Sequence, residues 1–407
     1  MYTLTDAGEA RLESYLDDLG ALLGDKRRKA SFATYALGLL GEGERKSVEP
    51  IAARSSGSAA EVEAAHQRLL HLLARSEWND RAVRRFGTRY ALKKMTTEHP
   101  VEASVIDDTG FLKQGEHSVG VQRQYTGSAG KIANCQVGVS LCLVTRNDHL
   151  PVDFSLYLPR EWTDDDARRA KVGIPEETVF KTKPELALEL VTRAKEDGLP
   201  LGVVLADSGY GNSAEFRLGL HRLGLPYSVG VAANSKVFEV HEVVNCGGHG
   251  IGLRKLADKL EAKGKFERFT WRTGSRGELS ARFAMRRVAP LGAQDNALDE
   301  RSTVWLLIEW RDGEADPANY YFSSLPPDTS LDTLVRITTQ RWRTERVYED
   351  LKGELGLDHF EGRSFRGWHH HISVVLSCYA FAVAERHRIF PLPTRRSRRA
   401  GALSGAA

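Results

Sequence analysis

The stretch VEASVIDDTGF, residues 101–111, runs from an apolar segment into two adjacent carboxylates and then into Thr109-Gly110. A second stretch, LGVVLADSGYG at residues 201–211, has the same design, with Asp207 at the end of its apolar run. Short apolar runs bounded by Gly, Pro and Asp are typical of buried strands in an α/β sheet. Functional groups in open α/β sheets collect where strands give way to loops. The two stretches therefore predict an α/β sheet whose acids share a cleft.

Acids brought together by two strands can bind a hard divalent cation, because such ions prefer oxygen ligands. The alternative is that each acid only caps the turn or helix that follows it. Asp107 and Asp108 compete for the first position, since neighbours in a strand project to opposite faces and only one can point into the cleft. The strand pattern alone leaves this choice open.

A third carboxylate, Glu345, stands in TTQRWRTERVYEDLK, residues 338–352, which has the composition of a helix. With 3.6 residues per turn, Arg341 and Lys352 would share one stripe of that helix with Glu345. Charged stripes are common on solvated faces, where they form ion pairs. This helix, however, also carries large or apolar side chains that indicate packing against the protein: Trp342, Val347, Tyr348, Leu351 and Leu355.

Phosphoryl transfer gives a reason for combining these residue types. Two cations about 4 Å apart activate a water or a 3′-hydroxyl and stabilise the departing oxygen. Several converging carboxylates are needed to hold the cations, whose charge keeps the acids ionised. Arginine and lysine beside the third acid would bind the phosphates that flank the reacting bond.

Five motifs resemble a known family, the bacterial insertion-sequence DDE transposases of the insertion-sequence-701-like group. Together they span most of the chain, and the set is far more specific than DSGYG alone. The motifs are DDTGF with Lys113 and Gly115, SVGVQRQYTGSAGKIANCQVGVSL at 118–141, LYLPREWTDD at 156–165, LADSGYG at 205–211, and RWRTERVYEDLKGELGLDHFEGRS at 341–364.

This resemblance implies an RNase H-like catalytic core with two Mg²⁺ (or Mn²⁺) ions per active site. It favours Asp108 over Asp107, because related families place the first ligand directly before threonine. The implied catalytic and metal-binding acids are therefore Asp108, Asp207 and Glu345. The third acid of related enzymes lies in a Tyr-x2-Arg-x3-Glu-x6-Lys signature, in which Thr338 here replaces the tyrosine.

Phosphate contacts are expected from Arg341 and Lys352 of that signature. Further DNA-phosphate contacts are expected from a polar, Gly-rich segment near the first acid, namely Lys113, Arg123 and Lys131. Two basic clusters, at residues 26–29 and 81–94, are either solvated helix faces or DNA-binding surfaces. Three consecutive histidines, His369-His370-His371, face different directions on a helix and are not expected to bind a metal.

The predicted fold class is α/β: an RNase H-like core with a β-rich insertion, preceded by an N-terminal helical domain. The gap from Asp207 to Glu345 is 345 − 207 = 138 residues, which is long enough to contain such an insertion. The predicted boundaries are 1–98 for the helical, DNA-binding domain, 99–227 for the first part of the core, 228–325 for the insertion, 326–390 for the C-terminal helices of the core and 391–407 for a basic, disordered tail.

The composition fits an intracellular protein. The chain has 407 residues, of which 41% are hydrophobic, and its net charge of +3 neither indicates nor excludes nucleic acid. Its four cysteines form no CxxC pair, and no apolar run reaches the roughly 18 residues of a membrane helix. We expect a cytoplasmic, nucleoid-associated protein that acts on double-stranded DNA, both terminal inverted repeats and target, as a dimer or larger assembly.

Cut-and-paste transposition by cleavage and 3′-hydroxyl strand transfer is the leading hypothesis for the function. One alternative is an RNase H-like nuclease without strand transfer. Another is a non-catalytic, transposase-derived DNA-binding repressor, against which the presence of all three acids argues.

Overall fold

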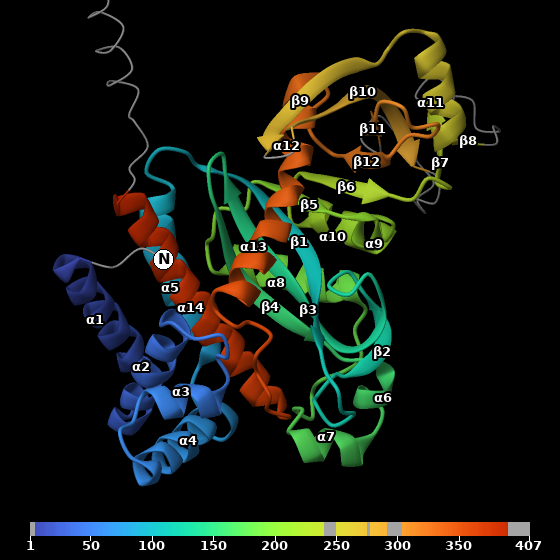
Figure 1. Ribbon diagram of the computed structural model, residues 1–407. Coiled ribbons are helices and arrows are strands. Elements are labelled where there is room, and N and C mark those ends of the chain that lie inside the picture. Colours follow the sequence, from blue (N-terminus) through green and yellow to red (C-terminus); the bar gives the residue numbers. More distant parts are fainter. Residues whose placement is uncertain (1–4, 240–249, 275–276, 291–302, 390–407) are drawn as a thin grey trace, which may run out of the picture. The chain divides into compact units, whose positions relative to one another are not determined.

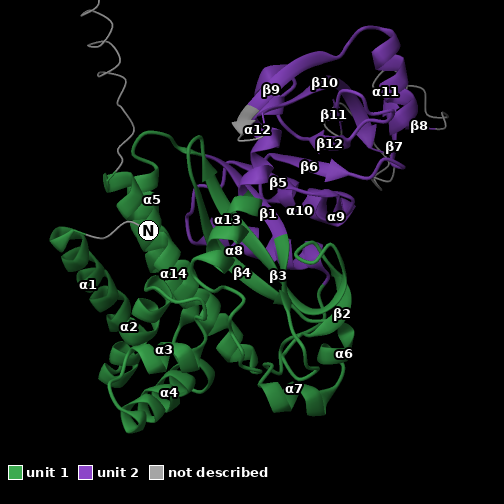
Figure 2. Ribbon diagram, in the orientation of Figure 1, with its two compact units in different colours: residues 1–101, 108–181, 344–407 green, residues 102–107, 182–343 purple. Residues whose placement is uncertain are grey.

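The computed structural model describes residues 5–239, 250–274, 277–290 and 303–389 (Figure 1). Cys246 and the predicted tail, 391–407, lie outside these ranges. The chain divides into two compact units (Figure 2). Unit 1 contains residues 1–101, 108–181 and 344–407, and unit 2 contains 102–107 and 182–343. The strand β1 (Val101–Leu112) passes from unit 2 into unit 1 between Asp107 and Asp108.

Unit 1 is built around one long C-terminal helix, α14 (Phe365–Ile389), which contacts α1, α2, α4 and α5 of the N-terminal part. Buried polar contacts join them: the Tyr15 hydroxyl donates to the Ser377 carbonyl at 2.8 Å, and the Tyr35 hydroxyl lies 2.8 Å from His371 Nδ1. The predicted N-terminal helices are thus confirmed, and they share a core with the end of the chain. They are α1 (Asp6–Ala21), α2 (Lys26–Leu40), α3 (Val48–Arg54), α4 (Ala59–Ala74) and α5 (Asp80–Met95).

Local sequence explains where these helices begin. Asp25 caps α2 by accepting hydrogen bonds from the backbone amides of the first turn. Ser58 and Glu61 form a reciprocal capping box at the start of α4, and Asn79 caps α5. Each cap satisfies amides that have no partner within the helix, which fixes the helix start to that residue.

The sheet of unit 1 consists of β2 (Gln122–Thr126), β3 (Lys131–Thr145), β4 (His149–Tyr157) and the second half of β1. β3 pairs antiparallel with both β2 and β4, and β1 is its other neighbour. The turn between β2 and β3 contains Gly130, whose φ of 62° suits glycine. The remaining helices of unit 1 are α6 (Arg160–Thr163), α7 (Asp166–Val172) and α13 (Arg343–Gly353).

Unit 2 begins with the first half of β1, which pairs parallel with β5 (Val203–Ala206); β5 in turn pairs parallel with β6 (Tyr227–Val231). The strand order continues through antiparallel β12, β11, β10, β7 and β8, with β9 beside β10. These strands are β7 (Lys236–Glu239), β8 (Ile251–Gly252), β9 (Glu267–Gly274), β10 (Gly277–Pro290), β11 (Val304–Trp310) and β12 (Asn319–Ser323).

The predicted fold class is confirmed by this topology. The hydrogen-bonded order β4–β3–β1–β5–β6, antiparallel between β3 and β4 and parallel from β1 to β6, is that of an RNase H-like core. The β-rich segment follows β6 in the chain, and β6 itself (Tyr227–Val231) overlaps the start of the predicted insertion, 228–325. Its helix α11 (Leu253–Ala262) was not predicted, although buried Leu253, Leu256 and Leu260 give it a helical apolar period. The other helices of unit 2 are α8 (Lys183–Glu196), α9 (Ser208–Gly211), α10 (Ala214–Arg222) and α12 (Leu331–Thr338).

The single helix expected around Glu345 is wrong in one respect. The segment is divided into α12, a 3₁₀ turn at Thr339–Trp342 and α13, so Arg341 does not continue the helical stripe of Glu345 and Lys352. A 3₁₀ turn has three residues per turn, which changes the direction of the side chains that precede α13. Glu102, at the start of β1, binds this segment through Arg336 at 2.7 Å and Gln340 at 2.8 Å.

The three consecutive histidines are structural, as expected. His369 Nδ1 lies 3.0 Å from the Phe365 carbonyl, and His370 Nδ1 lies 2.9 Å from that of Leu73. His371 contacts both Tyr35 and the carbonyl of Leu357, the latter at 3.1 Å through Nε2. Burial lowers the pKa of both His370 and His371 to about 4, so these rings are neutral at pH 7.

We expect unit 1 to lose stability as the pH falls from about 6.5 towards 4. A histidine with a lower pKa in the folded than in the unfolded state stabilises the fold fully above the unfolded pKa, and this stabilisation decreases with falling pH. At pH 5 the loss is about 2 kcal/mol for each of His370 and His371. Thermal unfolding at pH 7 and pH 5 measures it. In His371→Gln the unfolding midpoint should differ less between pH 7 and pH 5 than it does in the wild type. A wild-type midpoint that is equal at the two pH values would refute the explanation.

None of the described helices is both long and apolar enough to cross a membrane.

Candidate active site

Asp207 is positioned by the end of β5. The strand VVLA is buried, and Asp207 follows it as the N-cap of α9, with its Oδ1 accepting from the Gly209 amide at 2.9 Å. Gly230 of β6 lies against this turn, because a Cβ there would come within 2.9 Å of the Ser208 nitrogen. One carboxylate oxygen of Asp207 is therefore used in the cap, and the half-buried side chain is held at the strand end.

The register of β1 and β5 indicates which acid of β1 faces the same way as Asp207. β1 and β5 pair in parallel with a constant offset of 100 residues, from Ala103↔Val203 to Val105↔Leu205. Continuing that register two residues further aligns Asp107 with Asp207. Aligned residues of neighbouring strands project to the same face, and Asp108 projects to the other face. Within unit 2, this continuation of the register favours Asp107 over Asp108 as the neighbour of Asp207.

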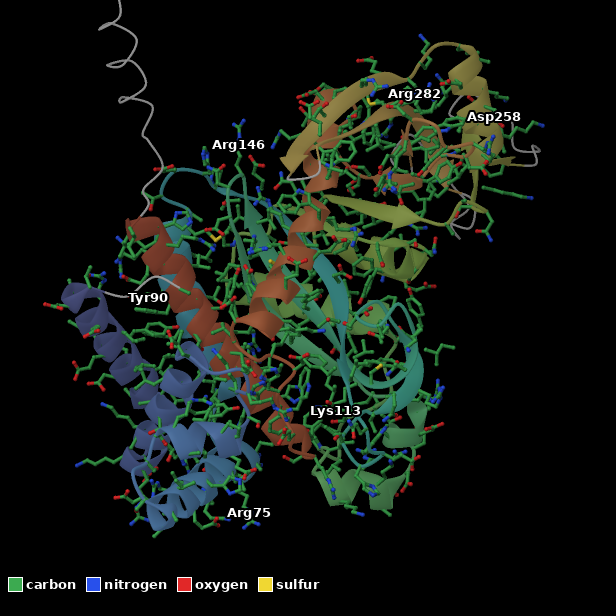
Figure 3. The ribbon with its side chains drawn as sticks, in the orientation of Figure 1. Arg75, Tyr90, Lys113, Arg146, Asp258 and Arg282 are labelled. Atoms are coloured by element: carbon green, nitrogen blue, oxygen red, sulfur yellow. The ribbon has the colours of Figure 1, made fainter. Side chains whose placement is uncertain are left out.

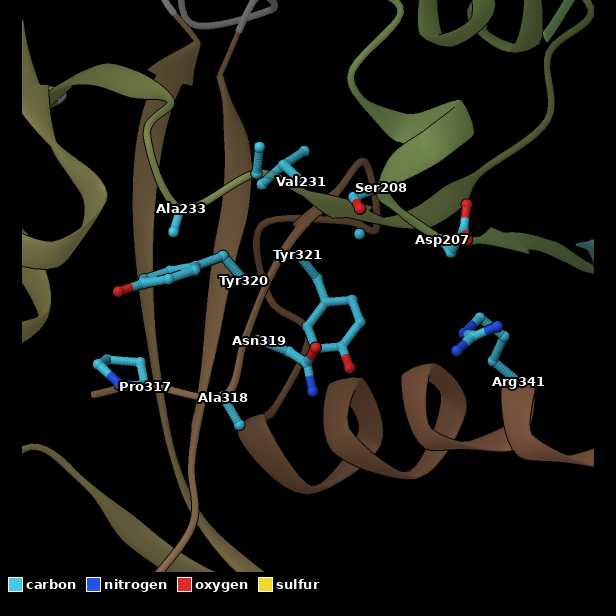
Figure 4. A pocket seen from close by; sticks show the side chains of 12 residues that line it. Asp207, Ser208, Val231, Ala233, Pro317, Ala318, Asn319, Tyr320, Tyr321 and Arg341 are labelled. Atoms are coloured by element: carbon cyan, nitrogen blue, oxygen red, sulfur yellow. The ribbon is translucent and has the colours of Figure 1, made fainter. Parts of the chain in front are cut away.

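Arg341 joins this pair of acids. Its Nη1 lies 3.2 Å from Asp107 Oδ2, and both side chains are mostly shielded, with exposed fractions of 31% and 16%. Arg341 also lines a pocket of about 390 Å³ together with Asp207. Figure 4 shows Asp207 and Arg341 at one end of this pocket, Pro317 and Tyr320 at the other, and Tyr321 between them.

The wall of the pocket is fixed by a buried carboxylate, Glu309 of β11, which is 4% exposed. Asn319 donates to Glu309 Oε2 at 2.9 Å and the Tyr321 hydroxyl donates to the same oxygen at 3.1 Å. Burial raises the pKa of Tyr321, so its hydroxyl stays protonated. Since Glu309 is satisfied by these donors and by Arg311, it supports the wall and is not a further metal ligand of the pocket.

The acids Asp107 and Asp207 have the donor chemistry that a hard divalent cation requires, since both are carboxylates at strand ends. Among the residues that the structure describes, no group of three or more His, Cys, Asp or Glu side chains is gathered closely enough to hold a metal ion. The two predicted acids Asp108 and Glu345 belong to unit 1, whereas Asp207 belongs to unit 2.

Lys352 is held by two hydrogen bonds within unit 1. Its ammonium donates to the Gly110 carbonyl at 2.8 Å and to Ser128 Oγ at 2.9 Å. Ser128, in the β2–β3 turn, also donates to Gly110 O and contacts Thr109 Oγ1, both at 3.2 Å. Burial lowers the pKa of Lys352 from its usual value. This network orients the ammonium next to the strand segment that follows Asp108.

Glu345 lies two turns before Lys352 on α13 and is exposed. The opposite side of the helix is anchored: Val347 and Leu351 are buried, and Tyr348 Oη lies 2.6 Å from Ser140 Oγ on β3. The predicted packing of this helix is thus confirmed, and Glu345 projects from a fixed segment of backbone.

The three other predicted phosphate ligands differ in their surroundings. The ammonium of Lys113, labelled in Figure 3, donates to the Phe360 carbonyl at 2.5 Å, and burial lowers its pKa. Lys113 therefore ties β1 to the segment before α14 within unit 1. Arg123 on β2 and Lys131 on β3 are exposed and accessible to a ligand.

Sequence reasoning did not find the Arg341–Asp107 pair or the role of Ser128. The first depends on the 3₁₀ turn, for which the sequence has no distinct signal. The second could have been suspected from the TGSAG turn between two strands, where a serine hydroxyl is close to backbone and neighbouring strands. Arg160-Glu161-Trp162 also had no assigned role: Trp162 is fully buried and donates to the Val121 carbonyl at 2.9 Å.

Family comparison gives the class of protein to which this fold belongs. The model of the DDE superfamily endonuclease family matches residues 18–278, more than half of the chain, and the chain belongs to this family. A second model, the transposase DDE domain, matches residues 181–381.

Among individual proteins, the chain is similar to the probable transposase for insertion sequence element IS701 of Microchaete diplosiphon, with 33% identity over 172 residues. This match covers 42% of each protein, so the chain spans less than half the length of that relative. The resemblance to insertion-sequence DDE transposases is therefore confirmed. A solved piggyBac transposase synaptic complex with hairpin DNA is similar over 93% of this chain and 76% of its own, at 10% identity and a TM-score of 0.41.

Proposed function

We propose that this protein is a DNA transposase that cleaves double-stranded DNA at the ends of a mobile element and joins the released 3′-hydroxyls to target DNA. The proposal is supported by membership of the DDE superfamily endonucleases and by the similarity to an insertion-sequence transposase. The observation that carries it is that Arg341 pairs with Asp107 on β1 and lines a pocket with Asp207, which follows the neighbouring parallel strand β5.

The acids would hold the metal ions. Asp207 and Glu345 remain the proposed second and third ligands, and the strand register favours Asp107 over Asp108 as the first. Two Mg²⁺ or Mn²⁺ ions would, when bound, supply activation of the attacking hydroxyl and stabilisation of the departing oxygen. The residues of this chain contribute negative charge at fixed places, since Asp207 is held by its helix cap and Asp107 by its strand.

The cations would bind the substrate phosphates. Arg341 is planar and can bind a phosphate with two parallel hydrogen bonds, whereas Lys352 acts as a point charge oriented by Ser128. In the structure Arg341 pairs with Asp107. Binding of a phosphate by Arg341 would release Asp107 from this ion pair and leave its carboxylate available to a cation. Phosphate binding by Arg341 and cation binding by Asp107 would therefore favour each other. Arg123 and Lys131 are proposed as further contacts to the DNA backbone.

A cleavage and joining assay tests the proposal. The substrate is DNA carrying the ends of the element, incubated with the full chain in the presence of Mg²⁺, Mn²⁺ or a chelator. We expect cleavage at the element end and transfer of the 3′-hydroxyl to a second DNA, both abolished by the chelator. Cleavage without joining would indicate a nuclease, and end binding with no cleavage in either metal would indicate a DNA-binding repressor.

A further inference from the structure

A basic pocket lies in the N-terminal helices of unit 1, between α2 and α4. Its volume is about 400 Å³, and it is lined by three arginines, Arg27, Arg28 and Arg68, with a single acid, Asp25. The end of α4 can be found in Figure 3 by the labelled Arg75, which directly follows this helix. A concave surface with an excess of one charge concentrates ligands of the opposite charge.

The acid in the pocket is already engaged. Asp25 Oδ1 accepts from the backbone amides of Arg27 at 2.8 Å and Arg28 at 3.1 Å, as the cap of α2. These two hydrogen bonds lower the pKa of Asp25. The carboxylate therefore completes the helix start, and the side chains of the arginines are left for a ligand.

Two of the three arginines in the pocket lack a partner within the described residues and can bind a ligand. Arg28 is fixed through Nη1, which donates to the carbonyls of Leu23 at 3.2 Å and Glu77 at 2.8 Å. The exposed side chains of Arg27 and Arg68 form no hydrogen bond or ion pair with any residue that the structure describes. The neighbouring Lys29, in contrast, pairs with Asp17 at 3.0 Å.

Two hydroxyls and an imidazole complete the lining. Ser31 is 8% exposed, and its hydroxyl has no hydrogen-bond partner among the described residues. Ser76 Oγ lies 3.0 Å from His71 Nδ1, so the other ring nitrogen of His71 remains for a ligand. The Ser31 hydroxyl can therefore donate a hydrogen bond to a ligand in the pocket.

We propose that this pocket binds a phosphate of the DNA backbone and is the surface by which the N-terminal helices hold DNA. Several guanidiniums with hydroxyl donors match the charge and oxygens of a phosphodiester, and they recognise no base. The volume exceeds that of one phosphate and admits the attached sugar. The inference rests on the proposed function, because it assumes a DNA substrate.

The test compares two double variants with the same loss of charge. Arg27→Ala/Arg68→Ala removes the two accessible arginines, and Lys26→Ala/Lys29→Ala on the same helix removes two charges that do not line the pocket. Binding of a short duplex is titrated at several salt concentrations, for an element end and for an unrelated sequence. We expect the pocket variant to bind both duplexes at least about tenfold more weakly, with a salt dependence lower by about two units of slope.

The control variant should retain nearly the affinity and slope of the wild type. Equal weakening in both double variants would overturn the proposal, because it would reflect net charge alone. Competition with inorganic phosphate and a free mononucleotide forms a second arm. A mononucleotide that stabilises the wild type but not the pocket variant, with DNA binding equal in both, would identify a free nucleotide as the ligand and would also overturn it. A wild-type chain that binds no DNA would refute the proposed function itself.

Discussion

Glu345→Gln should lose DNA cleavage by several orders of magnitude while its binding to DNA ends stays close to that of the wild type. Glutamine keeps the size and hydrogen bonding of the side chain but removes the negative charge that a hard cation needs. Glu345 is exposed on α13 and contributes nothing to the buried side of that helix, so the substitution should leave the fold intact. A gel-shift assay and a cleavage assay on one DNA end, with both proteins, measure the two effects.

Glu349→Gln is a matched control for this experiment. Glu349 lies one turn further along α13, is also exposed, and pairs with Arg346 at 3.3 Å. Its substitution removes the same charge from the same helix, and cleavage should stay near the wild-type rate. If folded Glu345→Gln protein cleaves as well as the wild type, the third acid or the mechanism has been assigned wrongly.

Asp107→Asn and Asp108→Asn should differ widely in their effects. The register with β5 aligns Asp107 with Asp207, so we expect Asp107→Asn to reduce cleavage by several orders of magnitude. Asp108 projects from the other face of β1, and Asp108→Asn should reduce cleavage much less. The two substitutions are adjacent and chemically identical, which makes each the control for the other. Single-turnover cleavage with Mg²⁺ and Mn²⁺, beside thermal unfolding of both proteins, gives the comparison.

A larger loss in Asp108→Asn would restore the assignment that the family resemblance implies. Binding provides an independent readout. Asp107→Asn removes the partner of Arg341, so its affinity for DNA should stay equal or rise, whereas loss of Arg341 should weaken binding to all sequences alike.

Most of the fold could be predicted from local patterns. The runs that became β1, β3 and β5 are apolar and end at turn residues, and α8 begins at a recognisable capping box of Thr182 and Glu185. Strand order and register could not be predicted, because pairing depends on contacts distant in the sequence. For that reason the strand pattern left the choice between Asp107 and Asp108 open, and the register is the structural argument for Asp107.

The candidate site was predictable in residue types but only partly in geometry. The acids Asp207 and Glu345 were predicted because each stands in a distinctive motif. Arg341 was assigned to the wrong stripe, because helical periodicity gives no signal for the 3₁₀ turn that precedes α13. Lys113 shows a similar limit: a lysine near an acid looks available for phosphate, yet its ammonium is bound by the Phe360 carbonyl.

The shared core of α14 and the N-terminal helices has a consequence for how the protein is made. The end of α5 and the start of α14 are 365 − 95 = 270 positions apart. This whole interval must be synthesised before Tyr15 can bind Ser377 and Tyr35 can bind His371. At roughly 5–20 residues per second, α1–α5 wait about 15–55 s on the ribosome with apolar faces uncovered. The N-terminal helices are thus translated well before α14 and complete their folding only after it. A transcript or chain that stops before Phe365 would yield an aggregation-prone fragment and not a small DNA-binding domain, which limits the forms in which a truncated copy of the gene could act.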